Sequence, residues 1–291
     1  MINKVIATII TLAASAFCAS ATTPMDVRFH NETSDTTLLS TLLTEASQRR
    51  FDTPEERNEF FARKFIGTPY VAHTLESDSA EVLTVNLDQL DCTTFVETVL
   101  ALSYTAAEGR SSWRDYIYNL RRLRYRNGQT DGYPSRLHYI CDWAVDNIHR
   151  GNIADATNSF PRINFVVRTI DFMSANSDKY PALRDSANLA RIRSIEDGYR
   201  NHKFSYVKTI NLGDKETKAA FHSGDIVALV SNLKNLDVTH MGIVVREPDG
   251  ELHLLHASSS GGKVEITDRP LADFMKKNRQ WLGLRIFRLT E

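Results

Sequence analysis

The hydrophobic pattern of the chain changes period near residue 204, and this change constrains the fold more than any other sequence feature. Before it, apolar residues recur at helical spacing, with predicted helices at 36–48, 54–65, 93–107, 113–123, 138–149 and 187–199 and a short strand at 82–87. After it, apolar and polar residues alternate, with predicted strands at 204–210, 225–230, 238–245, 252–257, 263–266 and 282–289. Helices followed by a meander of strands predict an α+β fold with a mostly antiparallel sheet.

The predicted elements form one domain. The 291 residues leave room for one large domain or two small ones, but no internal repeat and no linker rich in Pro or Ser divides the chain. We therefore expect residues 22–291 to form a single domain, with an irregular lead at 22–33. Residues 110–200 are predicted to be a helical insert that packs over the core.

Residues 1–21 have the pattern of a secretory signal peptide. Lys4 precedes an apolar run that ends at Phe17, and small residues follow up to Ala21. We expect cleavage after Ala21 and a soluble protein that is periplasmic or otherwise exported. The alternative is a lipid anchor at Cys18, but the bulky Phe17 stands where such signals prefer a small residue. No stretch of the sequence approaches the ~20 apolar residues of a membrane span.

The charge balance excludes one class of partner. The chain has 35 Lys and Arg residues against 36 Asp and Glu residues, a formal net charge of −1. Such a chain has no broad basic field to hold a phosphate backbone, so we expect no nucleic-acid partner. Arginines crowd residues 121–126, and we interpret them as the solvated face of a helix. A clamp for carboxylate or phosphate groups near a cleft is the alternative.

Cys92 is the strongest candidate for a nucleophile, because it begins an apolar helix just after a short extended segment. A helix N-terminus offers free backbone N–H groups and the positive end of the helix dipole. Both stabilise a thiolate, the reactive form of cysteine, and the same N–H groups can hold an oxyanion. Cys141 is expected in the middle of a helix as a buried packing thiol, so the fold needs no disulfide.

A cysteine nucleophile needs a base and a group that orients the base. His240 is the best candidate for the base, because Gly242 on the same strand face leaves space beside its imidazole. A turn at 248–250 pairs its strand with the next one, so that His256 reaches the ring of His240. A single histidine on an apolar strand is more often structural. The three residues together, each in the required element, favour acyl transfer through cysteine.

Other chemistries lack their motifs in this sequence. It contains no glycine-rich nucleotide loop, no G-x-S-x-G elbow and no H-E-x-x-H zinc motif. His253 and His256 are three residues apart on a predicted strand, so they point to opposite faces and cannot share one zinc ion. We therefore expect no metal site and no cofactor, since cysteine acyl transfer uses neither.

These residues stand in motifs that resemble a known family. The motifs are Asp-Cys-Thr-Thr-Phe-Val at 91–96, Thr-His-Met-Gly-Ile-Val-Val at 239–245, Leu-His-Ala-Ser at 255–258 and Gly-Thr-Pro-Tyr at 67–70. They resemble the NlpC-type papain-like cysteine hydrolases of bacterial cell walls, in which the tyrosine of the last motif lines the active site. The resemblance implies a papain-like core with the nucleophile helix packed on the sheet. It also makes Tyr70 a candidate for the oxyanion hole, beside the N–H of Cys92.

Residues 91–98 and 132–143 resemble, more narrowly, an N-acetylmuramoyl-L-alanine amidase-like branch. This resemblance implies cleavage of the amide that joins the muramyl lactyl group to L-alanine. The modest charge and the extra helical segment near 132–143 favour released muropeptides over the intact wall as the partners. Thr93 and Thr94 stand where the general family has Ser-Gly, so the pocket beside the nucleophile should differ from that of the common endopeptidases.

The roles of the remaining candidate site residues have two interpretations each. Asp91 either binds a substrate amine or caps the helix. Arg136, His138 and Tyr139 either contact sugar or peptide, or form a buried polar tie between the insert and the core.

Three alternative functions stay open. A γ-D-glutamyl endopeptidase would use the same Cys92, His240 and His256 on a neighbouring bond. A non-catalytic wall-binding module would keep the fold without a competent set of three, and their presence counts against it. A metalloamidase would need three clustered ligands, and the sequence offers no such set.

Overall fold

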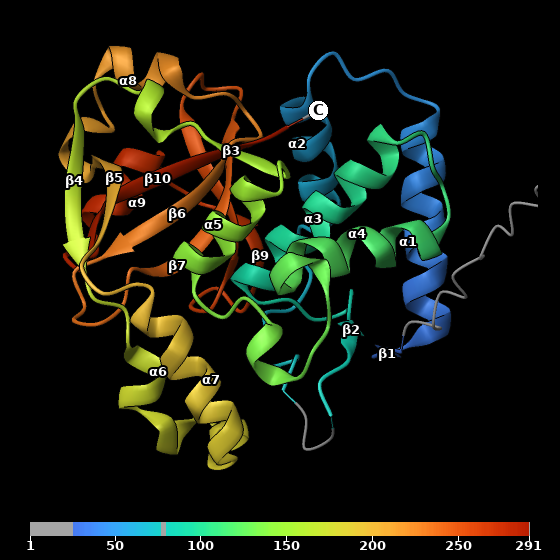
Figure 1. Ribbon diagram of the computed structural model, residues 1–291. Helices are drawn as coiled ribbons and strands as arrows, with labels where there is room; N and C mark the ends of the chain where they lie inside the picture. The colour runs from blue at the N-terminus through green and yellow to red at the C-terminus, as the bar shows by residue number, and fades with distance from the viewer. Residues whose placement is uncertain (1–25, 77–79, 291) are drawn as a thin grey trace, which may run out of the picture.

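The computed structural model describes residues 26–76 and 80–290, which form an α+β fold around one large sheet (Figure 1). Its strands pair antiparallel, in the order β4 (Ile163–Arg168), β5 (His202–Lys208), β10 (Trp281–Leu289), β6 (Ile226–Ser231), β7 (Val238–Arg246), β8 (Leu252–Ser258) and β9 (Lys263–Ile266). The short β3 (Ile153–Asp155) pairs with the end of β10. The predicted mixed α+β class with a mostly antiparallel sheet is confirmed.

Helices cover one face of this sheet, beside it in Figure 1. They are α1 (Glu32–Ser47), α2 (Pro54–Lys64), α3 (Cys92–Ala107), α4 (Trp113–Arg124) and α5 (Ile140–His149). The apolar helix α3 packs against β7 and β8, and the core between helices and sheet buries Phe61, Phe95 and Trp143 completely. On the other face, α8 (Lys215–Ala220) and α9 (Leu271–Lys276) lie near a second core that includes Phe221 and Met275. The sheet is therefore covered on both faces, and β8 is buried along its whole length.

The segment 110–200 contains more than helices. It holds β3 and β4, two strands that the pattern did not predict, and these join the main sheet through β10 and β5. Its helices α6 (Phe172–Ala175) and α7 (Ser186–Asp197) surround a small core of their own, with Ile170, Met173 and Ile192. In Figure 1 these two helices project below the sheet.

The expectation of an irregular lead at 22–33 is wrong for its described part. Residues Val27–Phe29 form β1, which pairs in parallel with β2 (Leu83–Val85). Helix α1 begins earlier than predicted, because the side chain of Asn31 caps it by accepting a hydrogen bond from the N–H of Ser34.

The predicted signal peptide at 1–21, including Cys18, lies outside the described residues. Among the helices of the described part, none combines the length and the apolar character needed to cross a bilayer.

Candidate active site

Cys92 is the first residue of α3, and the helix starts there because Asp91 caps it. One carboxylate oxygen of Asp91, Oδ1, accepts hydrogen bonds from the backbone N–H groups of Thr93 (3.0 Å) and Thr94 (2.8 Å). In return, the hydroxyl of Thr94 accepts a hydrogen bond from the N–H of Asp91 at 2.9 Å. Helix capping is therefore the role that the structure shows for Asp91.

The sulfur of Cys92 meets strand β7 at the residue that follows His240. The backbone of Met241 forms a hydrogen bond with the sulfur, and the hydroxyl of Thr93 lies 4.0 Å from it. The side chain of Cys92 is partly buried. The fold thus brings the nucleophile helix and the strand of the candidate base together, although Cys92 and His240 lie about half the chain apart.

The protonation state of Cys92 differs from the expectation for a helix N-terminus. Burial raises the pKa of its thiol to about 12, and the negative charge of Asp91 adds to the rise. Hydrogen bonds from Met241, Thr93 and the N–H of Cys92 itself lower the pKa by less. This pKa favours a neutral thiol at pH 7 in the free protein, whereas the helix N-terminus alone would favour a thiolate.

The side chains of His240 and His256 form a close pair. His240 Nε2 and His256 Nδ1 lie 2.7 Å apart, and the two ring planes are nearly perpendicular, at 88°. Burial lowers the pKa of His240 to about 3, helped by the charge of His256, and burial alone lowers the pKa of His256 to about 4. Both rings are therefore neutral at pH 7, so one of them donates a proton to the shared hydrogen bond and the other accepts it.

This hydrogen bond engages Nε2 of His240 and leaves Nδ1 as its other ring nitrogen. When Nε2–H of His240 donates to His256, Nδ1 keeps its lone pair and can accept a proton. The pair can therefore supply a neutral general base on β7.

Gly242 makes the approach of the two strands possible. A Cβ atom at this position would lie 2.9 Å from the Cβ of His256 and 2.9 Å from the carbonyl oxygen of Leu255. Contacts this short do not occur for real side chains, so any larger residue would displace β8 or His256. The space that the sequence predicted beside His240 is filled by His256.

A cleft of about 350 Å³ opens over the two histidines. Its other lining residues are Thr239, Ser258, Ser259, Ser260, Phe274, Asn278, Gln280 and Trp281. Phe274 on α9 packs edge-on against His256, with ring centroids 5.4 Å apart, and also against Trp281 at 5.2 Å. The sequence analysis missed this lining. No motif or spacing relates α9 to the histidines, and only the folded sheet brings them together.

Tyr70 and Cys92 both pack against the main core, near enough for an ionised Cys92 to affect the pKa of the Tyr70 hydroxyl. Its backbone is held by a hydrogen bond from its N–H to the carbonyl of Gly262 (2.9 Å) and by a bridge to Leu90. Burial raises the pKa of the Tyr70 hydroxyl, and the charge of an ionised Cys92 is the next largest cause. The phenol therefore stays protonated at pH 7 and is a hydrogen-bond donor near the sulfur.

Arg136 and His138 belong to a buried polar group near α5. The guanidinium of Arg136 contacts Glu76 at 2.7 Å and Glu81 at 3.5 Å. His138 Nε2 pairs with the carbonyl oxygen of Tyr133 at 2.9 Å, and burial followed by the charge of Arg136 lowers the pKa of His138 to about 3. The ion pairs of Arg136 tie the loop before α5 to Glu76 and Glu81, while the bond of His138 stays within that loop.

Tyr139 links α5 to the projecting helices. Its hydroxyl donates to Glu196 Oε1 on α7 (2.7 Å) and accepts from the N–H of Met173 on α6 (2.6 Å). Tyr139 and His138 also line a pocket of about 200 Å³ together with Tyr133, Phe172, Lys179 and Tyr180. The polar tie is thus present for Tyr139, and the pocket beside it is open to a ligand.

Cys141 corrects a prediction about local structure. Helix α5 begins at Ile140, so Cys141 lies in its first turn and not in its middle. It is fully buried, and its N–H donates to Asp237 Oδ2 at 2.6 Å. Burial raises the pKa of the Cys141 thiol far above its usual value, and the charge of Asp237 adds to this. Position in a first helical turn therefore does not distinguish the two cysteines, whereas burial does, since Cys92 is only partly buried. Both thiols are free.

One group of three potential metal ligands exists among the described residues. It consists of Glu55, His222 and Asp225, whose ligand atoms lie within 4.8 Å of one another. Arg288 binds both carboxylate oxygens of Asp225, at 2.7 and 3.0 Å, and its positive charge disfavours a cation there. This group shares no residue with the Cys92, His240 and His256 set.

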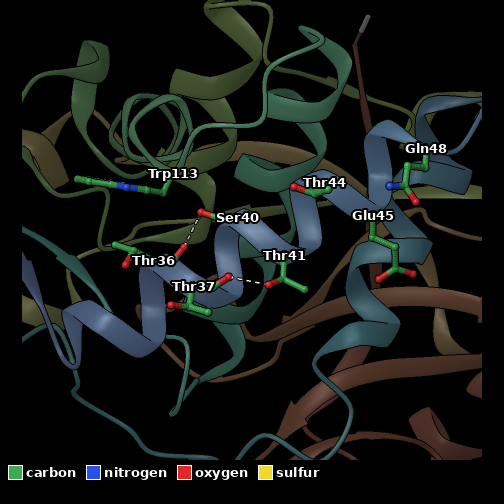
Figure 2. A pocket seen from close by; sticks show the side chains of 8 residues that line it. All are labelled: Thr36, Thr37, Ser40, Thr41, Thr44, Glu45, Gln48 and Trp113. Atoms are coloured by element: carbon green, nitrogen blue, oxygen red, sulfur yellow. Dashed lines mark hydrogen bonds between the residues drawn. The ribbon is translucent and has the colours of Figure 1, made fainter.

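A second open groove, of about 700 Å³, runs along α1 (Figure 2). Hydroxyl side chains and Trp113 line it, and the hydroxyls of Ser40 and Thr41 donate to carbonyls of their own helix at 2.7 and 2.8 Å. Its lining offers hydroxyl groups but neither a cysteine nor a histidine that could activate one of them. The cleft over the histidines is the better candidate active site.

The raised thiol pKa predicts how Cys92 reacts with iodoacetamide. Between roughly pH 6 and pH 9 the alkylation rate should rise about tenfold per pH unit, because the thiolate fraction of a group with a far higher pKa rises in that proportion. The rate is measured by mass spectrometry of the intact protein, with Cys18→Ser and Cys141→Ser as the background so that only Cys92 is labelled. A rate that is flat over this range would instead indicate a preformed thiolate–imidazolium pair.

The chain is similar to known amidases. The family profile described as N-acetylmuramoyl-L-alanine amidase-like matches residues 60–284. The crystal structure of an N-acetylmuramoyl-L-alanine amidase from Bacteroides uniformis is similar with a TM-score of 0.77 and 36% sequence identity, over 82% of this chain and 99% of that chain.

Two further crystal structures share the fold. A Bacteroides fragilis protein proposed to be a xylanase has a TM-score of 0.73 and 37% identity, over 79% of this chain and 99% of that chain. A Legionella pneumophila protein has a TM-score of 0.70 over 89% of this chain and 96% of that chain, but its 19% identity shows the fold alone. No match to this chain was found among curated proteins.

Proposed function

Because the chain belongs to the N-acetylmuramoyl-L-alanine amidase-like family, we propose that it cleaves the amide between N-acetylmuramic acid and L-alanine by acyl transfer through Cys92. The family match and the B. uniformis amidase support a peptidoglycan hydrolase in general. The observation that carries the cysteine mechanism is the contact of Cys92 with β7 at Met241, directly after the paired His240. A helix N-terminus packed on an antiparallel sheet also supports a papain-like core of the NlpC type.

In the first step, His240 removes the proton of the Cys92 thiol while the sulfur attacks the amide carbonyl. Both groups start neutral, so proton transfer accompanies attack and does not precede it. The imidazolium that forms is stabilised by His256, which accepts the hydrogen bond from Nε2–H of His240.

The oxyanion of the tetrahedral intermediate needs hydrogen-bond donors near the sulfur. The N–H of Cys92 is available, because it donates to no carbonyl within the described part of the chain. The hydroxyl of Tyr70 is the second donor. These two groups form the oxyanion hole of the proposed mechanism.

The intermediate then breaks down in two stages. His240 gives its proton to the leaving amine, which departs as the free N-terminus of the L-alanyl peptide, and the muramyl lactyl group remains on Cys92 as a thioester. Water, deprotonated by His240, hydrolyses this thioester and restores the thiol. No step needs a metal ion or a cofactor.

Substrate binding is assigned to side chains around Cys92, His240 and His256. The pocket lined by His138 and Tyr139 is assigned to the sugar or the peptide of the substrate, and Arg136 lies behind it. Asp91 Oδ1 caps the helix, and its other oxygen accepts no hydrogen bond from the described residues, so it can meet a substrate amine. An exported location, directed by the signal peptide at 1–21, would put the protein where peptidoglycan lies.

The alternatives have less support. Glycosidases of the common types act through two carboxyl groups that flank the bond, and the described lining of the histidine cleft contains no carboxylate. A purely wall-binding module would not need the buried, hydrogen-bonded pair of His240 and His256. A γ-D-glutamyl endopeptidase could use the same residues, so an experiment must separate it from the amidase.

Digestion of purified muropeptides separates the two activities. We expect the protein to release the intact L-alanyl peptide from sugar-bearing muropeptides and to leave sugar-free tripeptides uncut, because the proposed bond is absent from the latter. Mass spectrometry of the products identifies the bond that is cut. Cleavage of the sugar-free peptides after D-glutamate would replace the amidase assignment with the endopeptidase, and the Cys92→Ala protein serves as the blank.

A further inference from the structure

A polar pocket of about 520 Å³ lies between α6, α7 and the start of the following loop, outside the residues assigned to catalysis. It is lined by Thr169, Asp171, Ser174, Arg193, Glu196, Asp197, Arg200 and Asn201. Pockets of this size hold small organic molecules. The lining combines carboxylates, guanidinium groups and hydroxyls, so any ligand would be recognised mainly by charge and hydrogen bonding.

Two carboxylate oxygens at this pocket are buried without a partner. Glu196 is only 3% exposed, and although Oε1 accepts hydrogen bonds from Tyr139 and from the N–H of Ser174 (3.0 Å), Oε2 has none. Asp171 precedes α6 but does not cap it, and its Oδ1 is also buried and unpaired. A buried carboxylate oxygen without a donor is costly and rare in native proteins. Two such oxygens at one cavity indicate a missing group that donates hydrogen bonds.

The charges at the pocket define that group further. Asp197 and Arg200 neutralise each other, at 2.8 and 3.0 Å. This leaves the anions Asp171 and Glu196 and the cation Arg193, which forms no ion pair with the described residues. The pocket therefore offers a negative inner end and a separate exposed guanidinium.

A metal ion fits this arrangement less well than an ammonium group. The group of three closely spaced metal ligands in the described residues lies at Glu55, His222 and Asp225, and Asp171 and Glu196 belong to no such group. A cavity of about 520 Å³ is also far larger than an ion. An ammonium group donates up to three hydrogen bonds, which suits two carboxylates and the hydroxyl of Ser174.

We propose that this pocket binds a zwitterionic amino acid or peptide end, with its ammonium group between Asp171 and Glu196 and its carboxylate on Arg193. Charge-assisted hydrogen bonds of this kind are the stronger ones in proteins. Because Glu196 also holds the hydroxyl of Tyr139, the ligand would contact the same side chain that joins α7 to α5. This inference does not depend on the proposed amidase activity.

The test is a nuclear magnetic resonance titration of the full-length protein with L-lysine. Cadaverine, which lacks the carboxylate, and hexanoate, which lacks the ammonium group, are the matched probes. We expect lysine to shift the backbone amides of residues 169–174 and 193–201, cadaverine to bind more weakly and hexanoate to have no effect there. Asp171→Asn and Glu196→Gln should each weaken lysine binding about tenfold or more, as loss of a charged partner does.

Matched variants keep the result interpretable. Asp178→Asn removes an exposed carboxylate from the same segment but outside the pocket, and it should leave lysine binding unchanged. Glutamine at 196 can still accept the hydrogen bond from Tyr139, and Asp171→Asn leaves that bond untouched, so the segment should stay folded. Absence of lysine-induced shifts at the pocket, or wild-type affinity in both pocket variants, would overturn the proposal. Equal binding of cadaverine and lysine would remove Arg193 from the site and overturn the zwitterionic ligand.

Discussion

Replacement of Cys92 by alanine is expected to lower kcat/KM for muropeptides by roughly 10⁶-fold, the loss typical of removing a catalytic nucleophile. Without the sulfur, no covalent intermediate forms, and His240 has no thiol to deprotonate. The fold should persist, because the Cys92 side chain is only partly buried and Asp91 caps α3 through backbone N–H groups that alanine retains. Product formation is followed by chromatography of the released peptide.

Cys141→Ala is the matched control for this result. Cys141 also lies in a first helical turn, but it is completely buried beside the carboxylate of Asp237. Its replacement should lower the free energy of unfolding by about 1 to 2 kcal/mol through lost packing, with activity retained. Loss of turnover in Cys141→Ala together with an active Cys92→Ala protein would show that the nucleophile has been assigned to the wrong cysteine.

His240→Ala should be almost as damaging as Cys92→Ala, and the double variant should lose little more than either single one. Nucleophile and base act as a unit, so removing the second partner of an already broken pair costs little. The neutral thiol makes this dependence stronger, because little thiolate is present to attack without the base. Steady-state kinetics of the three variants at one pH measure the coupling.

His256 tests the orienting half of the same pair. His256→Asn can still accept a hydrogen bond from Nε2–H of His240, so we expect part of the activity to remain. His256→Ala removes the acceptor and should cost up to about 10⁴-fold in kcat, as for other residues that orient a catalytic histidine. If His256→Ala keeps full activity, the hydrogen bond of 2.7 Å has only a structural role.

The sequence predicted the elements of the site better than its electrostatics. Local rules are sufficient to place Cys92 at a helix N-terminus, since Asp91 and Thr94 supply the cap within four residues. The pairing of β7 with β8 follows from the turn between them, and with it the contact of His240 and His256. The pKa of Cys92, by contrast, depends on how deeply β7 covers the sulfur, which no local pattern reports.

The elements and contacts that the sequence analysis did not predict depend on contacts between distant segments. The strands β3 and β4 are stabilised by pairing with β10 and β5, and β1 by pairing with β2. Phe274 reaches His256 only because α9 packs on β8. Periodicity describes one segment at a time, so it cannot supply such partners.

The separation of Cys92 and His240 along the chain has a consequence for the time at which the protein becomes active. During translation α3 emerges early and can pack with α1, α2 and α4, while β7, β8 and β10 are made near the end. Non-local strand pairing is the slow part of folding and must wait for these segments. A ribosome-bound chain that ends before β7 therefore carries the thiol without its base. We expect such nascent chains to be inert, so that hydrolytic capacity appears only when synthesis is nearly complete.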